Sequence, residues 1–371
     1  MKLLIEKNIL LESLTNVMRA ISPKNIIPIL NGVMFDLKED GLYLTASDSD
    51  LTIRNFIPKE KIKNIAIPGK IVIQSKYLLE IIRKLPNGDI NIEVIDGLKI
   101  IISTDKTIYN LNCLDTADYP DINLEEVENP IVINSTTLKQ AFNKTLFAVS
   151  TQESRPILTG INFKINGNII ECVATDSYRL AKKTITLDNA YESHDIVIPG
   201  KNINELDKLI TDESDVEIHV FNNKIVFKYM NYIFQSSLLS GSYPNTNNLI
   251  PTKFDYVITT SLNDYYNAID RAALLTQNKD KNIIKMETNN TELLISSYAS
   301  EIGKSEESIL INKSNEQDIS ISFSSKYMID ALKTFEDEEL IIFLNNDSSP
   351  IILKSTKDET LIQLILPIKT Y

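Results

Sequence analysis

The stretch RPILTGINFKINGNIIECVATDSYRLA, residues 155–181, repeats the pattern of an earlier one, PILNGVMFDLKEDGLYLTASDS, at residues 28–49. Both place proline, glycine, phenylalanine, alanine, aspartate and serine at the same spacing, so that Pro28 and Pro156 begin copies 128 positions apart without a gap. Self-similarity at a fixed period is typical of duplicated structural units. The sequence therefore predicts repeated domains.

The repeat extends beyond this pair of segments. IAIPGK at 65–70 returns as IVIPGK at 196–201, and ISISFSSK at 319–326 takes the matching place in the last third of the chain. ADYPDINL around Tyr119 is echoed by GSYPNTNNL around Tyr243. These matches indicate three related units, of which the third has diverged most.

Two stretches of distinct composition separate the thirds. DINLEEVENP (121–130) is acidic, and PNTNNLIPTK (244–253) is rich in asparagine and proline, as connecting segments commonly are. A chain of 371 residues is long enough for three domains of ordinary size. We expect domains at residues 1–128, 129–251 and 252–371.

Each third has the same predicted order of elements. An amphipathic helix opens it, with N-caps expected at Asn8 in the first third, Ser135 and Thr136 in the second, and Thr260 and Ser261 in the third. A second helix is expected in each third, at 75–85, 202–210 and 325–335. Alternating apolar runs joined by turn residues predict hairpins at 91–103, 216–229 and 339–355. The predicted fold class is α+β with mostly antiparallel sheets, each of the three domains being two βαβββ halves.

Composition narrows the class of protein. No stretch approaches the roughly 20 uninterrupted apolar residues of a membrane span. Glu6 and Lys7 interrupt the apolar run at the N-terminus, which argues against a signal peptide and favours the cytosol. Cys113 and Cys172 lie in strand-like runs and are expected to be buried thiols. With only two histidines and no cluster of Cys and His, we expect no zinc site.

Catalytic motifs are hard to find. Gly303-Lys304-Ser305 resembles a phosphate loop, but Tyr298 stands where the required upstream glycine would be. Asp48 and Asp176 occupy one repeat position in different domains, so the simpler interpretation is that each caps a turn by accepting backbone N–H bonds. A hydrolase that uses these aspartates remains the alternative. We predict that the chain is not an enzyme and needs no cofactor.

The formal net charge of −12 argues against tight binding to nucleic acid, which usually requires a basic surface. Basic residues nevertheless gather at helical positions, where they could form a locally positive face on a negative molecule. An ordinary solvated helix surface is the other interpretation. The positions are Arg19, Lys76, Arg83, Lys84, Lys139, Lys144, Lys208, Arg271, Lys326 and Lys333.

The triplicate plan, ATDSYRLA at 174–181, IPGK, SYPNTNNLIP at 242–251 and the C-terminal LILPIKTY together resemble the bacterial sliding clamp, the β subunit of DNA polymerase III. The resemblance covers the whole chain. It implies the DNA-clamp fold, a head-to-tail homodimeric ring around duplex DNA, and a role as a processivity factor that slides on DNA without reading its sequence. It also implies partners that bind through short peptides: the replicative polymerase, the clamp loader and repair proteins.

By this resemblance, a peptide pocket forms from both the second and the third domain. Its expected residues are Leu158, Thr175, Ser177, Tyr178, Arg179, Leu180, Pro244, Asn248, Leu249, Pro350, Leu364, Ile365, Leu366, Pro367, Ile368 and Lys369. The family often has histidine at the position of Tyr178 and arginine at that of Lys369, so the larger phenol is expected to narrow or gate the pocket. Taken alone, LILPIKTY could equally be a buried terminal strand.

The resemblance also assigns residues to the two other surfaces of a clamp. Lys24, Gln152 and Arg155 match positions that contact DNA. At the dimer interface, Tyr109 and Leu111 of the first domain are expected to meet Leu274 and Leu275 of the third, although a core within each domain would explain these apolar residues too. A repeat-built scaffold that does not bind DNA is a further alternative.

Overall fold

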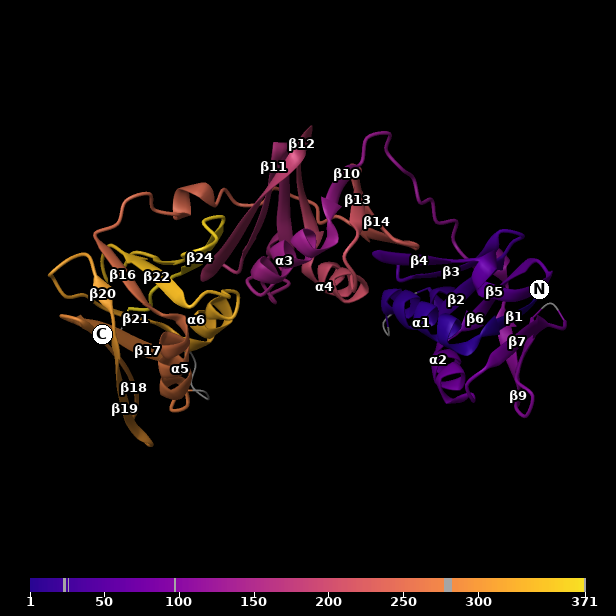
Figure 1. Ribbon diagram of the computed structural model, residues 1–371, viewed down its shortest axis with the longest axis horizontal. Helices are drawn as coiled ribbons and strands as arrows, with labels where there is room; N and C mark the ends of the chain where they lie inside the picture. Colours follow the sequence, from indigo (N-terminus) through magenta and orange to yellow (C-terminus); the bar gives the residue numbers. More distant parts are fainter. Residues whose placement is uncertain (23–24, 26, 97, 277–281, 370–371) are drawn as a thin grey trace. The chain divides into compact units, whose positions relative to one another are not determined.

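A computed structural model describes the chain apart from residues 23–24, 26, 97, 277–281 and 370–371 (Figure 1). The fold is α+β, and all the strand pairs described are antiparallel. The described residues form two compact units, the first from 1–138 and 201–238 and the second from 139–200 and 239–371.

The first unit is built on a sheet of thirteen strands. Its helices are α1 (Lys7–Val17), α2 (Ser75–Lys84) and α4 (Gly200–Leu209). Its strands are β1 (Lys2–Glu6), β2 (Gly32–Leu37), β3 (Gly41–Ser47), β4 (Leu51–Pro58), β5 (Ile62–Ile67), β6 (Gly69–Gln74), β7 (Asp89–Val94), β8 (Lys99–Ser103), β9 (Ile108–Leu114), β10 (Ile131–Asn134), β13 (Asp215–Val220), β14 (Lys224–Tyr229) and β15 (Tyr232–Ser237). The pairing of β15 with β4 joins strands of the first and second sequence repeats into one sheet.

The second unit contains a seven-stranded and a four-stranded sheet. Its helices are α5 (Leu262–Ala273) and α6 (Ser325–Leu332), which pack against each other, and α3 (Ser135–Leu146) enters it from the first unit. Its strands are β11 (Gly160–Thr175), β12 (Arg179–Pro199), β16 (Tyr256–Ser261), β17 (Ile283–Asn289), β18 (Glu292–Ala299), β19 (Gly303–Leu310), β20 (Asn312–Lys313), β21 (Ser320–Ser324), β22 (Glu339–Leu344), β23 (Ile351–Ser355) and β24 (Leu361–Ile365). β12 pairs with β24, which joins the second and third repeats.

The predicted hairpins are confirmed. β7 pairs with β8, β13 with β14, and β22 with β23. Gly97, which lies within the hairpin predicted at 91–103, is outside the described residues. The duplicated segments also share their strand register, since Ala46 is opposite Ile53 and Ala174 is opposite Ala181, each partner 128 positions from its counterpart.

Two of the predicted helix starts are wrong. α1 begins at Lys7 rather than after Asn8, because the side chain of Lys7 is buried and its Nζ donates to the Leu85 carbonyl. α3 is capped by Asn134, whose Oδ1 accepts from the Thr136 amide at 2.9 Å, because the Ser135 hydroxyl donates instead to the carbonyl of Asp212. The third start is confirmed, since Ser261 Oγ accepts from the Asp264 amide at 3.2 Å.

The acidic stretch at 121–130 is held against the β13–β14 hairpin. Lys228 Nζ lies 2.8 Å from a Glu126 carboxylate oxygen, and the Val127 amide donates to Nδ1 of His219 at 3.0 Å. His219 is 1 % exposed, and burial lowers the pKa of its imidazole below 6.5. The neutral ring is therefore the acceptor that fixes this stretch.

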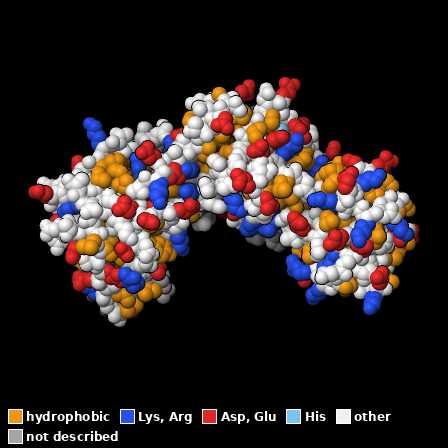
Figure 2. Space-filling view, viewed as in Figure 1, with side chains coloured by type: hydrophobic (Ala, Val, Ile, Leu, Met, Phe, Trp, Pro, Cys, Tyr) orange, Lys and Arg blue, Asp and Glu red, His pale blue; other side chains and the backbone are white. Residues whose placement is uncertain are grey.

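Several of the helical basic residues have acidic partners. Arg19 and Lys208 both contact Glu205, and Arg271 pairs with Glu307 on β19. Lys76, Lys84, Lys326 and Lys333 form no ion pair with a described residue. Acidic and basic side chains are interspersed over the visible face (Figure 2). The free positive charge on the helices is therefore smaller than a count of lysine and arginine indicates.

No helix in the described ranges combines the length and the apolar character needed to cross a membrane.

Candidate functional site: a pocket beside the C-terminal segment

The two repeated aspartates form matching turns. Asp48 Oδ1 accepts from the amides of Asp50 and Leu51 at 3.1 and 2.8 Å. Asp176 repeats this geometry with the amides two and three positions onward, at 3.0 and 3.1 Å. Such turns use the short side chain to satisfy backbone donors. The structural interpretation of these carboxylates is thus confirmed.

The second of these turns presents an aromatic side chain. Ser177 has φ of 76°, a left-handed conformation that reverses the chain between β11 and β12. Tyr178, which follows it, is 56 % exposed and stacks on Tyr327 of α6, with ring centroids 6.2 Å apart and 22° between the planes. The two rings form one side of the candidate site.

Arg179 supports this aromatic pair from beneath. It is 9 % exposed, and its Nε lies 3.0 Å from Asp176 while its Nη1 lies 2.7 Å from Asp330. Its guanidinium also lies 4.6 Å from the centre of the Tyr327 ring, a favourable cation–π distance. All of these contacts are made within the second unit. Arg179 therefore holds the turn and α6 together.

The C-terminal segment forms the opposite side. After β24, the amide of Leu366 donates to the carbonyl of Tyr178 at 2.9 Å, and the amide of Ile368 donates to that of Ser322 at 2.7 Å. These two bonds fix the direction of the segment while Leu366 stays 38 % exposed. The segment is therefore an ordered, partly exposed apolar wall.

Between these walls lies a cavity of about 630 Å³, within the size range of sites that take small ligands or peptide side chains. It is lined by Tyr178, Asn282, Ser324, Lys326, Tyr327, Leu366, Pro367, Ile368 and Lys369. No acidic residue is among these, and neither lysine forms an ion pair with a described residue. The pocket thus combines aromatic and aliphatic walls with positive charge.

An apolar cluster lies next to this pocket in the same unit. Leu180 and Leu364 are 2 % and 3 % exposed and pack with Val173 and Ile352. Tyr243 borders the cluster, and its hydroxyl accepts from the Thr175 amide at 3.0 Å. Burial raises the pKa of that phenol, so it stays protonated at neutral pH. This bond attaches the segment SYPNTNNLIP (242–251), which contains Tyr243, to the end of β11.

The structure brings only part of the expected pocket together. Tyr178 and the segment from Leu366 to Lys369 line one cavity, and Leu180 and Leu364 share the adjacent cluster. Ile365 is fully buried in the main core of the second unit. Leu158 and Thr175 are also buried, whereas Ser177, Pro244, Asn248 and Leu249 are exposed and Pro350 is half-buried, none of them lining this cavity.

Four lining residues were missed by sequence reasoning: Asn282, Ser324, Lys326 and Tyr327. A signal for two of them, Lys326 and Tyr327, exists. SKY begins α2 at 75–77 and returns at the start of α6 at 325–327, directly after β6 and β21. Asn282 and Ser324 had no comparable signal.

The residues expected at DNA and at the dimer interface are located as follows. Gln152 and Arg155 are exposed, and Arg155 donates to the Ser177 hydroxyl at 3.4 Å; Lys24 lies outside the described residues. Leu274 is 62 % exposed at the end of α5, with Leu275 half-buried beside it. Tyr109 and Leu111 on β9 are half-buried.

Both cysteines are buried and free, as predicted. Burial raises the pKa of the Cys113 thiol to about 11, and it raises the pKa of Cys172 as well. Neither thiol is ionised at neutral pH.

Three helix-and-sheet repeats, joined by strand pairing and carrying a peptide-sized pocket beside the C-terminal segment, define the class of DNA clamps. Three family models match the chain in order: the N-terminal domain of the DNA polymerase III beta subunit over residues 1–124, the central domain over 132–245 and the C-terminal domain over 247–369. The beta sliding clamp of Bacillus subtilis is 40 % identical and that of Staphylococcus aureus 37 %, each over the full length of both chains.

Solved structures agree with these matches. The crystal structure of the DNA polymerase sliding clamp from Bacillus subtilis superposes with a TM-score of 0.97, and that of the DNA polymerase III beta chain from Streptococcus pneumoniae with 0.96 at 34 % identity, both covering all of each chain. The chain belongs to the bacterial sliding clamp family, the β subunits of DNA polymerase III, which act as processivity factors in DNA replication.

Proposed function

We propose that two copies of this chain form a head-to-tail ring that encloses duplex DNA, slides on it, and tethers partner proteins through the pocket beside the C-terminal segment. The chain performs no catalysis in this proposal, its domains are 1–128, 129–251 and 252–371, and it works in the cytoplasm. The observation that carries the proposal is the full-length match to clamps combined with an ordered, positively charged apolar pocket.

Two exposed strand edges support the dimer. β19 ends the four-stranded sheet, so one side of it pairs with no strand of the described residues, and Leu310 on it is 76 % exposed. Within the same described ranges, β9 pairs with β6 at Cys113 and Leu114 alone, so its first five residues, beginning with the 68 % exposed Ile108, are paired on one side only. Unpaired edges with exposed apolar residues readily pair with another chain. Antiparallel pairing of β9 with β19 of the second copy would cover both, next to Leu274.

Enclosure reconciles DNA binding with the net charge of −12. A protein held by closure of a ring needs few phosphate contacts. Lys84 and Lys333, which form no ion pair with a described residue, and the exposed Gln152 and Arg155 would supply these contacts. Weak contacts of this kind also permit sliding. The turn role of Asp48 and Asp176 supports the absence of hydrolytic chemistry.

A short peptide with leucine and phenylalanine side chains suits the pocket. Apolar side chains would be buried against Leu366 and the tyrosine pair, at about 25 cal/mol for each Å² removed from water. Acidic side chains would lie near Lys326 and Lys369, which form no ion pair with an acidic residue in the part of the chain that the structure describes. Because Tyr178 stacks on Tyr327, we expect it to move aside when an aromatic side chain enters.

The test is binding of the acetylated, amidated peptide Glu-Leu-Glu-Leu-Phe by calorimetry. Leu366→Ala removes a wall that is already partly exposed, so it should weaken binding about tenfold, which corresponds to about 1.4 kcal/mol. Ile95→Ala, a change at an exposed apolar residue of the first unit, is the control and should leave binding unchanged. Equal affinity of the parent chain and Leu366→Ala would refute the pocket assignment.

A further inference from the structure

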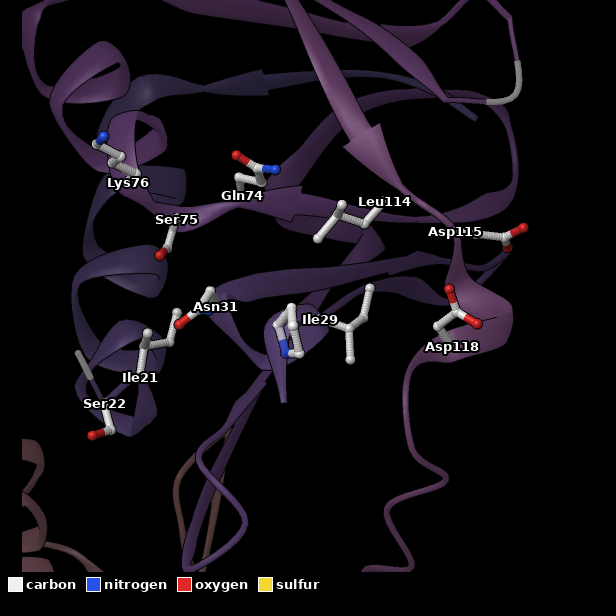
Figure 3. A pocket seen from close by; sticks show the side chains of 11 residues that line it. Ile21, Ser22, Ile29, Asn31, Gln74, Ser75, Lys76, Leu114, Asp115 and Asp118 are labelled. Carbon is white, nitrogen blue, oxygen red and sulfur yellow. The ribbon is translucent and has the colours of Figure 1, made fainter. Parts of the chain in front are cut away.

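A second pocket lies in the first unit, outside every site assigned above. It has a volume of about 800 Å³ and is lined by Ile21, Ser22, Pro28, Ile29, Asn31, Gln74, Ser75, Lys76, Leu114, Asp115 and Asp118. Figure 3 shows Ile29 and Leu114 in its middle, with Lys76 toward one end and the two aspartates toward the other. An apolar floor with charged ends is thus open to a ligand.

Strand register shows that this pocket is the repeat counterpart of the peptide pocket. Gln74 ends β6 opposite Gly32, and Ser324 ends β21 opposite Ile283, each just before the helix that begins with SKY. Asparagine precedes the opposite residue in both cases: Asn31 precedes Gly32, and Asn282 precedes Ile283. The floor of each pocket is therefore the same junction of strand and helix.

The end of β9 in the first unit also corresponds to the segment after β24 in the second. Leu114 pairs with Val72, two positions before the end of β6. Ile368 donates to Ser322, two positions before the end of β21, at 2.7 Å. Leu114 therefore takes the place of Ile368, and the next residue, Asp115, takes the place of Lys369.

This correspondence reverses the charge of one wall. The pocket in the second unit has two lysines and no acid, whereas the pocket in the first has Lys76 alone with Asp115 and Asp118. Asp118 forms no ion pair with a described residue, and Asp115 uses one oxygen to accept from the Ala117 amide at 3.0 Å. Both carboxylates are exposed and remain available to a cation.

The apolar part of the first pocket rests on a rigid base. Ile29, Leu30, Val72 and Tyr119 form a buried cluster, and Leu114 packs against it. A side chain that enters between Ile29 and Leu114 would meet preformed apolar surface, with no core to rearrange. This resembles the partly buried wall of the peptide pocket.

We propose that the pocket between Ile29, Leu114 and Asp115 is a second peptide-docking site, which binds segments that combine a leucine or phenylalanine with lysine or arginine. The inference goes beyond the proposed function, although the comparison of the two pockets rests on it. The two sites on one chain would then select peptides of opposite charge. A partner with a basic apolar segment could be held without displacing one bound at the C-terminal segment.

The test uses full-length protein labelled at isoleucine and leucine methyl groups, titrated with two acetylated, amidated peptides, Lys-Leu-Lys-Leu-Phe and Glu-Leu-Glu-Leu-Phe. The basic peptide should shift the methyl signals of Ile29 and Leu114, and the acidic peptide those of Leu366 and Ile368. At the first pocket the basic peptide should bind at least fivefold more tightly than the acidic one. Because exposed charges are screened, this ratio should fall in 0.5 M salt.

Variants make the charge argument falsifiable. Asp115→Lys copies the residue of the other pocket and should reverse the preference at Ile29 and Leu114 without changing the response of Ile368. Glu39→Lys makes the same change of charge on an exposed turn of the same unit and should reverse nothing. If Asp115→Lys alters the fold, Asp118→Asn should still reduce binding of the basic peptide at least twofold.

The outcomes separate the two proposals. If neither peptide shifts the methyl signals of Ile29 and Leu114, while those of Leu366 and Ile368 shift, the second site is overturned and the proposed function stands. Equal response of the first pocket to both peptides would also overturn the inference. If the methyl signals of Ile29 and Leu114 shift while those of Leu366 and Ile368 do not, the result would support the second site and count against the peptide pocket beside the C-terminal segment.

Discussion

Replacing Arg179 by alanine should destabilise the second unit more than any exposed charge substitution. The guanidinium contacts two carboxylates, at 3.0 Å to Asp176 and 2.7 Å to Asp330, and only a tenth of its side chain is exposed. Removing one partner of a buried ion pair typically costs about 3–5 kcal/mol. Since 30 % of the Asp330 side chain is exposed, water relieves part of this cost, and we expect the lower end of the range, about 3 kcal/mol.

The cation–π contact adds to this loss. The guanidinium lies 4.6 Å from the Tyr327 ring, an interaction worth about 1 kcal/mol when partly desolvated. Arg179→Lys keeps the charge but loses the planar fork, so it should recover only part of the stability. The double variant Arg179→Ala with Asp330→Ala should be more stable than the additive expectation, because only Asp176, and not both carboxylates, is then left without its cation.

The measurement is native-state hydrogen exchange of β12 and α6 amides, because a chain of several domains need not unfold in one step. The matched control is Arg155→Ala, whose exposed guanidinium makes a single 3.4 Å contact, and it should change stability by less than about 0.5 kcal/mol. Equal opening of the second unit in Arg179→Ala and Arg155→Ala would show that the two ion pairs of Arg179 do not stabilise it.

Three further predictions concern packing, protonation and assembly. Gly160→Ala would place a Cβ 2.5 Å from the Ile198 carbonyl oxygen and should lower the free energy of unfolding, measured by chemical denaturation, by about 2–3 kcal/mol. Gly167 has a left-handed backbone but lies in open space, so Gly167→Ala should lower it by about 1 kcal/mol. Equal losses of stability in the two variants would contradict the close approach at Gly160. Burial lowers the pKa of His219, so the unfolded state takes up the proton first and stability should fall as the pH drops below 6.5. Thermal unfolding of His219→Phe should show a smaller fall of stability with decreasing pH. The same dependence on pH in both proteins would mean that other groups cause it. Leu274→Lys should shift the sedimenting species toward monomer while Met230→Lys, equally exposed, remains a dimer; a dimeric Leu274→Lys protein would remove that residue from the interface.

Much of the fold was predictable because the repeated residues include turn and capping residues that determine the local backbone conformation. Asp48 and Asp176 close identical turns, and the hairpins follow from alternation and turn residues. The wrong helix starts have a tertiary cause, since the side chains of Lys7 and Ser135 donate to carbonyls far away in the sequence, and these bonds override cap preferences. Propensity carries no information about such tertiary bonds.

The candidate site was less predictable. Tyr178 and Leu366 were found through resemblance, but Tyr327 and Lys326 are brought by folding to Tyr178, from which 149 and 148 positions of sequence separate them. Arg179 looks like a ligand-binding arginine in sequence, yet the structure surrounds it with Asp176 and Asp330. Which charges remain free is decided by partners on other elements, and these cannot be read from spacing.

In the proposed function, the chain holds DNA by surrounding it. The most direct test loads the protein onto a nicked circular DNA with a clamp loader and ATP, isolates the complex in 0.5 M salt, and then cuts the circle once. We expect the protein to remain on the closed circle and to leave within minutes of linearisation, because contacts alone cannot retain so acidic a molecule at that salt concentration. Retention on the linear DNA, or loss from the uncut circle, would contradict the account.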